Sequence, residues 1–218
     1  MRRMILAAVL AAAAAMGLNA IQASDQKTGD DTANFFNGKN FEGFEGLLDE
    51  YWSVKDGAIV GKTNGLKFNT FLCSKKQYGD FELQFKVKMI GGNSGIQIRS
   101  KIHDPKKFAV TGPQCDMGGP YWGSLYGENF GGMMKLADAK LVGKVLKEKE
   151  FNDYYILAVG KKITIKLNGE TTVDDEFAKA PDMGIIAFQL HAGGPMEVTF
   201  KDIRFTDLSK SDKASGRR

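Results

Sequence analysis

A two-residue alternation in residues 81–89 is the feature that most constrains the fold of this chain. Every second residue is a large apolar one, and the residues between are polar or charged, in the order FELQFKVKM. Successive side chains of a strand point to opposite faces, so the pattern predicts a strand with one face in a core and the other in water. Antiparallel sheets commonly contain such strands, and this segment therefore favours an antiparallel β architecture.

Similar short segments, rich in β-branched and aromatic residues, recur along the chain between Gly, Asn and Asp turn signals. Asn168 and Gly169 form the dipeptide that most favours a two-residue hairpin turn, here leading into residues 171–173. Helical periodicity is weak after the N-terminal segment. The pattern predicts an all-β fold, a jelly-roll sandwich of two antiparallel sheets. The expected strands are residues 52–54, 58–61, 70–74, 80–89, 95–100, 112–117, 154–159, 162–167, 184–191 and 196–206.

The first 23 residues have the features of an export signal. Arg2 and Arg3 precede an apolar run, and small residues stand near residue 23. We expect a linker at 24–33, one domain at 34–208 and a disordered polar tail at 209–218. No later stretch reaches the ~20 apolar residues that cross a bilayer, so we expect a periplasmic or secreted protein without a membrane span. The sequence does not fix its oligomeric state.

Charge argues against nucleic acid as a partner. The formal net charge is +4, but it arises from Arg2, Arg3 and the basic tail, so that residues 24–209 are close to neutral. A near-neutral body lacks the basic stripe that neutralises phosphates. Cys73 and Cys115 could pair in an oxidising compartment, but sequence cannot supply the geometry that a disulfide requires.

Residues 184–191 carry a strand pattern with a polar face. Large apolar side chains occupy alternate positions from Ile186 to Leu190, while Gln189 and His191 share the other face. His191 is one of only two histidines, and imidazole changes charge near neutral pH. A strand histidine can equally be structural, so it needs polar companions before it counts as catalytic.

Two further strands offer such companions. Alternation places Gln97 with Arg99, and Gln114 with Asp116, on the faces opposite the apolar residues. If these strands are neighbours of 184–191, the three polar pairs line one concave surface suited to a sugar, whose hydroxyl groups need donors and acceptors. Alternatively, Arg99 and Asp116 form an ordinary ion pair and the amides are surface residues.

The interval 118–151 breaks the strand pattern with glycine pairs and a lysine-rich run, and it is either a functional cover or a tolerated insertion. Tyr121 and Trp122 could stack on a sugar ring or pack within the loop. Tyr126 and Glu128 could supply an acid. Asp116, Glu128 and His191 are competent metal ligands, so a divalent cation is possible, although their spacing is not diagnostic and no cofactor is expected.

Several catalytic signatures are absent from the sequence. It contains no nucleotide-binding glycine loop, serine nucleophile elbow or zinc-type spacing of His and Cys. A Glu-x-Asp-x-x-Glu strand, which a jelly-roll glucanase would need, is also missing. The second absence argues against retaining hydrolysis, in which two carboxyl groups flank the scissile bond.

Five ordered motifs resemble those of the DUF1080 family over about residues 35–208. They are NSGIQIR (93–99), GPQCDMG (112–118), YWGSLY (121–126), FNDY (151–154) and GIIAFQLH (184–191). The resemblance implies a concanavalin-like jelly roll and 3-keto-disaccharide hydrolase activity, through a 3-keto-glucoside 1,2-lyase and a 3-keto-2-hydroxy-glucal hydratase step. The expected partner is thus an oligosaccharide or a 3-keto-glycoside.

That chemistry needs one base, donors for an enolate oxygen and an acid for the leaving group. As a hypothesis, we assign Asp116 or His191 as the base and Arg99 with Gln114 or Gln189 as the enolate cradle. Tyr126 or Glu128 is the leaving-group acid, and Gln97, Tyr121 and Trp122 are expected to bind substrate. The alternatives are a carbohydrate-binding module without turnover and, third, a structural or adhesion domain.

Overall fold

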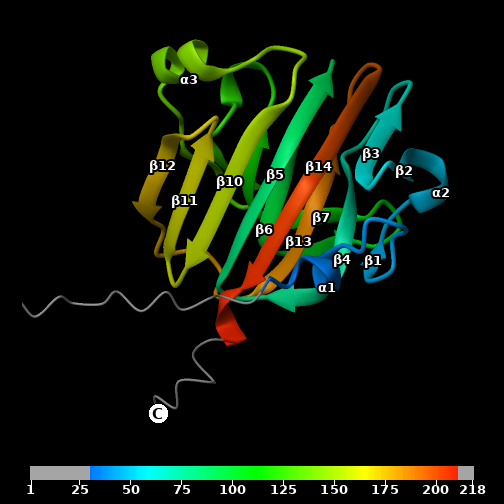
Figure 1. The fold of residues 1–218 in the computed structure, drawn as a ribbon, viewed down its shortest axis with the longest axis horizontal. Helices are drawn as coiled ribbons and strands as arrows, with labels where there is room; N and C mark the ends of the chain where they lie inside the picture. Colours follow the sequence, from blue (N-terminus) through cyan, green and yellow to red (C-terminus); the bar gives the residue numbers. More distant parts are fainter. Residues whose placement is uncertain (1–29, 211–218) are drawn as a thin grey trace, which may run out of the picture.

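The alternating segment 81–89 forms the middle strand of one of two seven-stranded antiparallel sheets. The computed structural model describes residues 30–210. Its two sheets pack as facing layers. The sheet that contains residues 81–89, called sheet B, is in front in Figure 1, and the other, called sheet A, is behind it. The predicted all-β fold of two antiparallel sheets is confirmed.

Sheet B contains the hairpin that the sequence predicted at Asn168 and Gly169. Asn168 and Gly169 both have positive φ, at 50° and 89°, as a two-residue turn of this kind requires. In spatial order, sheet B consists of β12 (Glu170–Glu176), β11 (Lys162–Leu167), β10 (Asn152–Val159), β5 (Phe81–Ile90), β14 (Met196–Asp207), β3 (Ala58–Thr63) and β2 (Trp52–Lys55).

Sheet A brings together strands that are far apart in the sequence. The strand predicted at 184–191 ends one residue early, so His191 follows directly after it. In spatial order, sheet A consists of β1 (Phe44–Glu45), β4 (Thr70–Tyr78), β13 (Gly184–Leu190), β6 (Ser94–Asp104), β7 (Ala109–Met117), β8 (Leu125–Glu128) and β9 (Gly132–Lys135). The three strands predicted to carry polar pairs, β13, β6 and β7, are therefore direct neighbours.

Apolar side chains fill both faces of β13. Ile186, Phe188 and Leu190 belong to the main core between the sheets. Ile185 and Ala187 join a smaller cluster on the outer face of sheet A. This outer cluster covers only part of the face, and beyond it polar side chains take over.

Residues 118–151 contain regular structure that the sequence analysis did not predict. They form β8, β9, a short 3-10 helix η1 (Gly119–Tyr121) and the helix α3 (Ala139–Val145). The Asp138 carboxylate caps α3 by accepting hydrogen bonds from the backbone N–H groups of Lys140 and Leu141. A helix of seven residues is too short to show clear periodicity, which explains the omission. The remaining helices are α1 (Thr32–Phe35), α2 (Leu48–Tyr51) and η2 (Leu208–Lys210).

The packed domain is slightly longer at both ends than predicted. The backbone N–H of Asp31, within the expected linker, donates to the carbonyl of Phe205. At the other end, the Ser209 hydroxyl accepts a hydrogen bond from the backbone N–H of Asp80. The predicted export signal at 1–23 lies outside the described residues. None of the helices within residues 30–210 has the length and apolar character needed to span a bilayer.

Candidate functional site

A pocket of about 560 Å³ opens on the outer face of sheet A, where the outer apolar cluster ends. Its lining residues lie on β7, β8, β9 and η1, directly after β9 and β13, and in the loops before β4 and β6. Six of the residues predicted for a site line it, namely Gln114, Asp116, Tyr121, Tyr126, Glu128 and His191, together with Asn69, Asn93, Met133 and Leu136.

Asp116 is the buried carboxyl group of this pocket, with 5% of its surface exposed. Its Oδ1 atom accepts hydrogen bonds from Met117 N at 3.0 Å, Gln114 Nε2 at 3.3 Å and Asn93 Nδ2 at 3.4 Å. No described residue donates a hydrogen bond to Oδ2. Burial raises the pKa of Asp116 to about 6, and the hydrogen bonds and the nearby His191 lower it only in part. The result is a carboxylate with one fixed oxygen and one oxygen free to act as an acceptor.

The backbone of Asp116 is held from the opposite sheet. The hydroxyl of Tyr154, on β10, crosses the core and donates to the Asp116 carbonyl at 3.0 Å. That carbonyl also accepts from Gly123 N, and Asp116 N donates to Ser124 O. Burial raises the pKa of Tyr154 well above its ordinary value, so the phenol stays a neutral donor. These contacts fix the carboxylate relative to the sandwich.

Asn69 joins two other candidate groups of the pocket. Its Nδ2 donates to Glu128 Oε1 at 3.0 Å, and its Oδ1 accepts from Ala192 N at 2.8 Å. The His191 Nδ1 atom lies 2.6 Å from the Ala192 carbonyl oxygen. Because a carbonyl only accepts, Nδ1 is the donor in this contact. Asn69 thus links the Glu128 carboxylate to the backbone directly after His191.

The three predicted amides form a chain beneath the pocket. The amides of Gln97 and Gln114 meet at 2.9 Å, and Gln114 Nε2 donates to Gln189 Oε1 at 3.2 Å. Gln97 and Gln189 are fully buried and do not line the pocket. Gly95 leaves the room for this chain, since a Cβ there would lie 2.6 Å from Cγ of Gln114. Only Gln114 of the three amides can therefore contact a molecule in the pocket.

The expectation that Arg99 shares this surface is wrong. Between the pairs Gln97–Gln114 and Lys101–Thr111, β6 contains one residue more than β7. This bulge reverses the alternation, and Arg99 has a φ of +46° within it. The prediction assumed unbroken alternation, so it placed the guanidinium on the wrong face.

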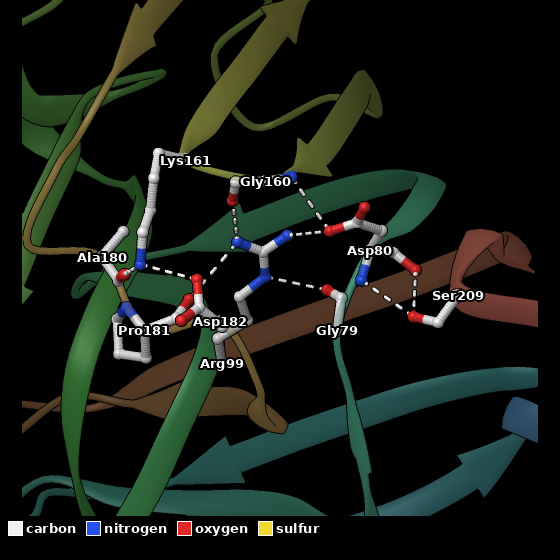
Figure 2. A network of polar contacts seen from close by, with 9 residues as sticks. All are labelled: Gly79, Asp80, Arg99, Gly160, Lys161, Ala180, Pro181, Asp182 and Ser209. Atoms are coloured by element: carbon white, nitrogen blue, oxygen red, sulfur yellow. Dashed lines mark hydrogen bonds and ion pairs between the residues drawn. The ribbon is translucent and has the colours of Figure 1, made fainter. Parts of the chain in front are cut away.

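Arg99 instead lies at one end of the sandwich, where it binds several turns (Figure 2). Its Nε donates to Gly79 O at 2.8 Å, and Nη1 donates to the carbonyls of Gly160 and Pro181. Its ion pair is with Asp80, at 2.8 Å, so the alternative of a pair with Asp116 is wrong as well.

Tyr121 and Trp122 separate, although they are adjacent in sequence. Tyr121 is 43% exposed and lines the pocket. Trp122 is buried in the main core, so the expectation that it binds substrate is wrong and the alternative of packing is correct. Gly123, with φ of +74°, turns the chain directly after Trp122.

Four pocket residues were not predicted. Asn69 and Asn93 precede β4 and β6, where the alternation of a strand gives no information, and Met133 and Leu136 come from the interval that lacked a strand pattern. Asn93 did stand at the start of the motif 93–99. Asn–Ser–Gly before a strand was the signal that could have indicated a side chain at the pocket.

Within residues 30–210, no three His, Cys, Asp or Glu side chains converge as metal ligands would. Asp116, Glu128 and His191 share the pocket without forming such a group. Cys73 and Cys115 are both buried and unbonded. Cys73 lies in the outer cluster and Cys115 in the main core, on opposite faces of sheet A.

Comparison with protein families agrees with the motifs. Residues 31–206 match the model of the 3-keto-alpha-glucoside-1,2-lyase-like domain. The chain belongs to this family. The match spans nearly all of the described residues, including every side chain that lines the pocket. Membership makes this a carbohydrate-related domain. No curated protein matches the chain.

Solved structures share the fold of this family member. A candidate glycosyl hydrolase from Parabacteroides distasonis ATCC 8503 is 23% identical, with a TM-score of 0.60 over 80% of this chain and 92% of that one. A second from the same organism is 23% identical, with a TM-score of 0.57 over 78% and 96%. The carbohydrate-binding module CBM66 from Bacillus subtilis is 13% identical, with a TM-score of 0.56 over 75% and 95%. These similarities concern the fold alone.

Proposed function

We propose that the pocket is the active site of a 3-keto-glycoside lyase and hydratase, with Asp116 as the base. A ketone at C3 of a sugar acidifies the proton on C2, and a base can then remove it. The observation that carries the proposal is the free Oδ2 of a buried, positioned carboxylate whose pKa is about 6. A base with this pKa is largely ionised at neutral pH and is stronger than an ordinary carboxylate.

The electrons of the broken C2–H bond form an enolate, with its negative charge on the C3 oxygen. Asn93 donates one of its two amide N–H groups to Asp116 and can donate the other to that oxygen, replacing Arg99 in the cradle expected from sequence. Both N–H groups of Gln114 are used by Asp116 and Gln189. When the enolate collapses, the C1–O bond breaks and leaves a C1–C2 double bond. Water later adds to C1 and a proton returns to C2, so the net reaction is hydrolysis.

The departing oxygen needs a proton. Tyr126 pairs with Gln114 across β7 and β8, which places its phenol one strand from the proposed base. Glu128 is the other candidate, but its Oε1 already accepts a hydrogen bond from Asn69. We therefore assign the leaving-group proton to Tyr126, and His191 stays the alternative base.

The test uses purified protein with a 3-keto-disaccharide and its unoxidised parent, in D2O. We expect cleavage of the keto substrate only, with deuterium at C2 by mass spectrometry. Asp116→Asn should lower kcat about 10³-fold, and His191→Gln should lower it less. Asp153→Asn is the matched control, because that carboxylate is exposed on sheet B and paired with Lys86. Undiminished cleavage by both pocket variants would overturn the assignment, and hydrolysis of the parent would overturn the elimination.

One observation favours binding without turnover as the second candidate function. Tyr121 presents an exposed ring beside a polar floor, the arrangement on which sugars stack. If the protein is only a binding module, calorimetry would detect the disaccharide without product formation. Tyr121→Ala would then weaken binding, and neither the wild type nor Asp116→Asn would form product.

A further inference from the structure

The pocket changes from polar to apolar along one row of side chains. Across sheet A, Gln97 pairs with Gln114, Gln114 with Tyr126, and Tyr126 with Met133. Neighbouring strands are about 4.8 Å apart, so Met133 is about 10 Å from Gln114. A second ring, attached to a sugar that is bound at Asp116, would therefore reach Met133.

Met133 ends the row, and with Tyr121 and Leu136 of the same pocket it forms what we call the apolar rim. The exposed fractions of Tyr121, Met133 and Leu136 are 43%, 40% and 56%. Only six large apolar side chains in residues 30–210 are this exposed, and these three line the same pocket. Grouped exposed apolar side chains of this kind mark a surface that a ligand covers.

Charge further restricts the ligand. Asp116 and Glu128 are carboxyl groups of the lining, and none of the described lining residues is Lys or Arg. An anionic group such as a uronate or sulfate would meet like charge without a cationic partner. The pocket therefore favours neutral molecules.

We infer that this site selects neutral 3-keto-glycosides with an apolar leaving group, which lies on the rim of Tyr121, Met133 and Leu136. The inference rests on the proposed function and adds its substrate class. The ketone-bearing ring occupies the polar floor at Asp116, Gln114 and Asn93. The glycosidic oxygen then falls near Tyr126, midway along the row.

The experiment compares 3-keto-glucosides that differ only in the leaving group: cyclohexylmethanol, glucose or glucuronate. The sugar hydroxyl groups are more acidic than cyclohexylmethanol, so a higher kcat/KM for the cyclohexylmethyl compound cannot come from a better leaving group. We expect kcat/KM to be highest for the cyclohexylmethyl compound and lowest for the glucuronate. The double variant Met133→Ser/Leu136→Ser should lower kcat/KM about tenfold for the cyclohexylmethyl compound. The loss for the glucose compound should be smaller, because a hydroxylated ring gains less from contact with apolar side chains.

Met183→Ser is the control, since that side chain is 58% exposed and lies outside the pocket. Equal losses for both neutral substrates, no loss in the double variant, or a preference for the glucuronate would overturn the inference. If no keto compound is cleaved, the proposed reaction is wrong, and the inference about the rim is then tested by the affinity of the protein for unoxidised glucosides. Calorimetry would compare cyclohexylmethyl glucoside with methyl glucoside: tighter binding of the former, lost in the double variant, supports the rim, and equal affinities refute it.

Discussion

Two buried charges on sheet A, Arg99 and Asp116, have opposite surroundings. The Arg99 guanidinium donates from each of its three nitrogens, to three backbone carbonyls and to Asp80 (Figure 2). Asp116 receives its hydrogen bonds on Oδ1 alone, and Oδ2 is left to the pocket. A charge whose hydrogen-bonding capacity is used within the fold stabilises the fold, whereas a positioned charge with capacity left over is available for chemistry.

The largest effect expected from this comparison is on stability at the Arg99 end. Arg99→Met should lower the free energy of unfolding by about 3 kcal/mol, because it leaves the partners of a buried pair without their donor. Urea denaturation measures this, with exposed Arg204→Met as the control. If Arg99→Met does not fold, Arg99→Lys, which keeps the charge but not the fork, should be intermediate. Activity per folded molecule should not change in Arg99→Lys, and a loss of turnover there would break the comparison.

The free energy of unfolding should depend on pH through Asp116. Burial raises its pKa from 3.8 to about 6, so between these pH values the folded state holds a proton that the unfolded chain releases. The free energy of unfolding should therefore fall by about 2 kcal/mol as pH rises from 4 to 6, and become level above about pH 7 as far as this group is concerned.

Over the same window kcat/KM should rise, because the base becomes ionised. Urea denaturation and initial rates at several pH values check both trends. Asp116→Asn should remove this part of the stability change, with Asp153→Asn as the control. A pH dependence of unfolding identical in wild type and Asp116→Asn would contradict the raised pKa.

A smaller effect should come from Asn69, which we regard as a positioning residue for Glu128 and His191. Asn69→Ala should lower kcat about tenfold, since it removes the hydrogen bond to the Glu128 carboxylate and the one from Ala192 N, directly after His191. Asn69→Asp retains the acceptor for Ala192 N but places a carboxylate against Glu128. It should therefore shift a limb of the pH–rate profile along the pH axis, and not only change the height of the profile. Profiles of unchanged shape in both variants would assign Asn69 a structural role alone.

The smallest effect is expected at the exposed side of the Arg99 network. Lys161 pairs with Asp182 at 2.6 Å, but both side chains are well exposed. Lys161→Met should change Tm by less than about 2 °C, because solvent screens such pairs. Thermal denaturation checks this beside Arg99→Lys. Equal losses in the two variants would mean that burial is not what distinguishes Arg99.

Most of the fold could be predicted from local pattern. The alternation in β5 and the Asn168–Gly169 turn specify strands because side-chain direction and turn geometry are local properties. The same reasoning succeeded for Gln114 and Asp116, which lie on an uninterrupted strand. It did not find β8 and β9, whose few residues include glycines and carry little β pattern.

The sequence by itself determined the two-sheet architecture, the family and the face on which Asp116 lies, since all three follow from short-range pattern and ordered motifs. Only the tertiary structure decided that one extra residue in β6 turns Arg99 inward, that Trp122 packs in the core, and that Asn69 reaches Glu128 from a distant loop. The physical reason is that a bulge, a buried aromatic and a loop contact depend on which segments become neighbours. No local pattern encodes that proximity.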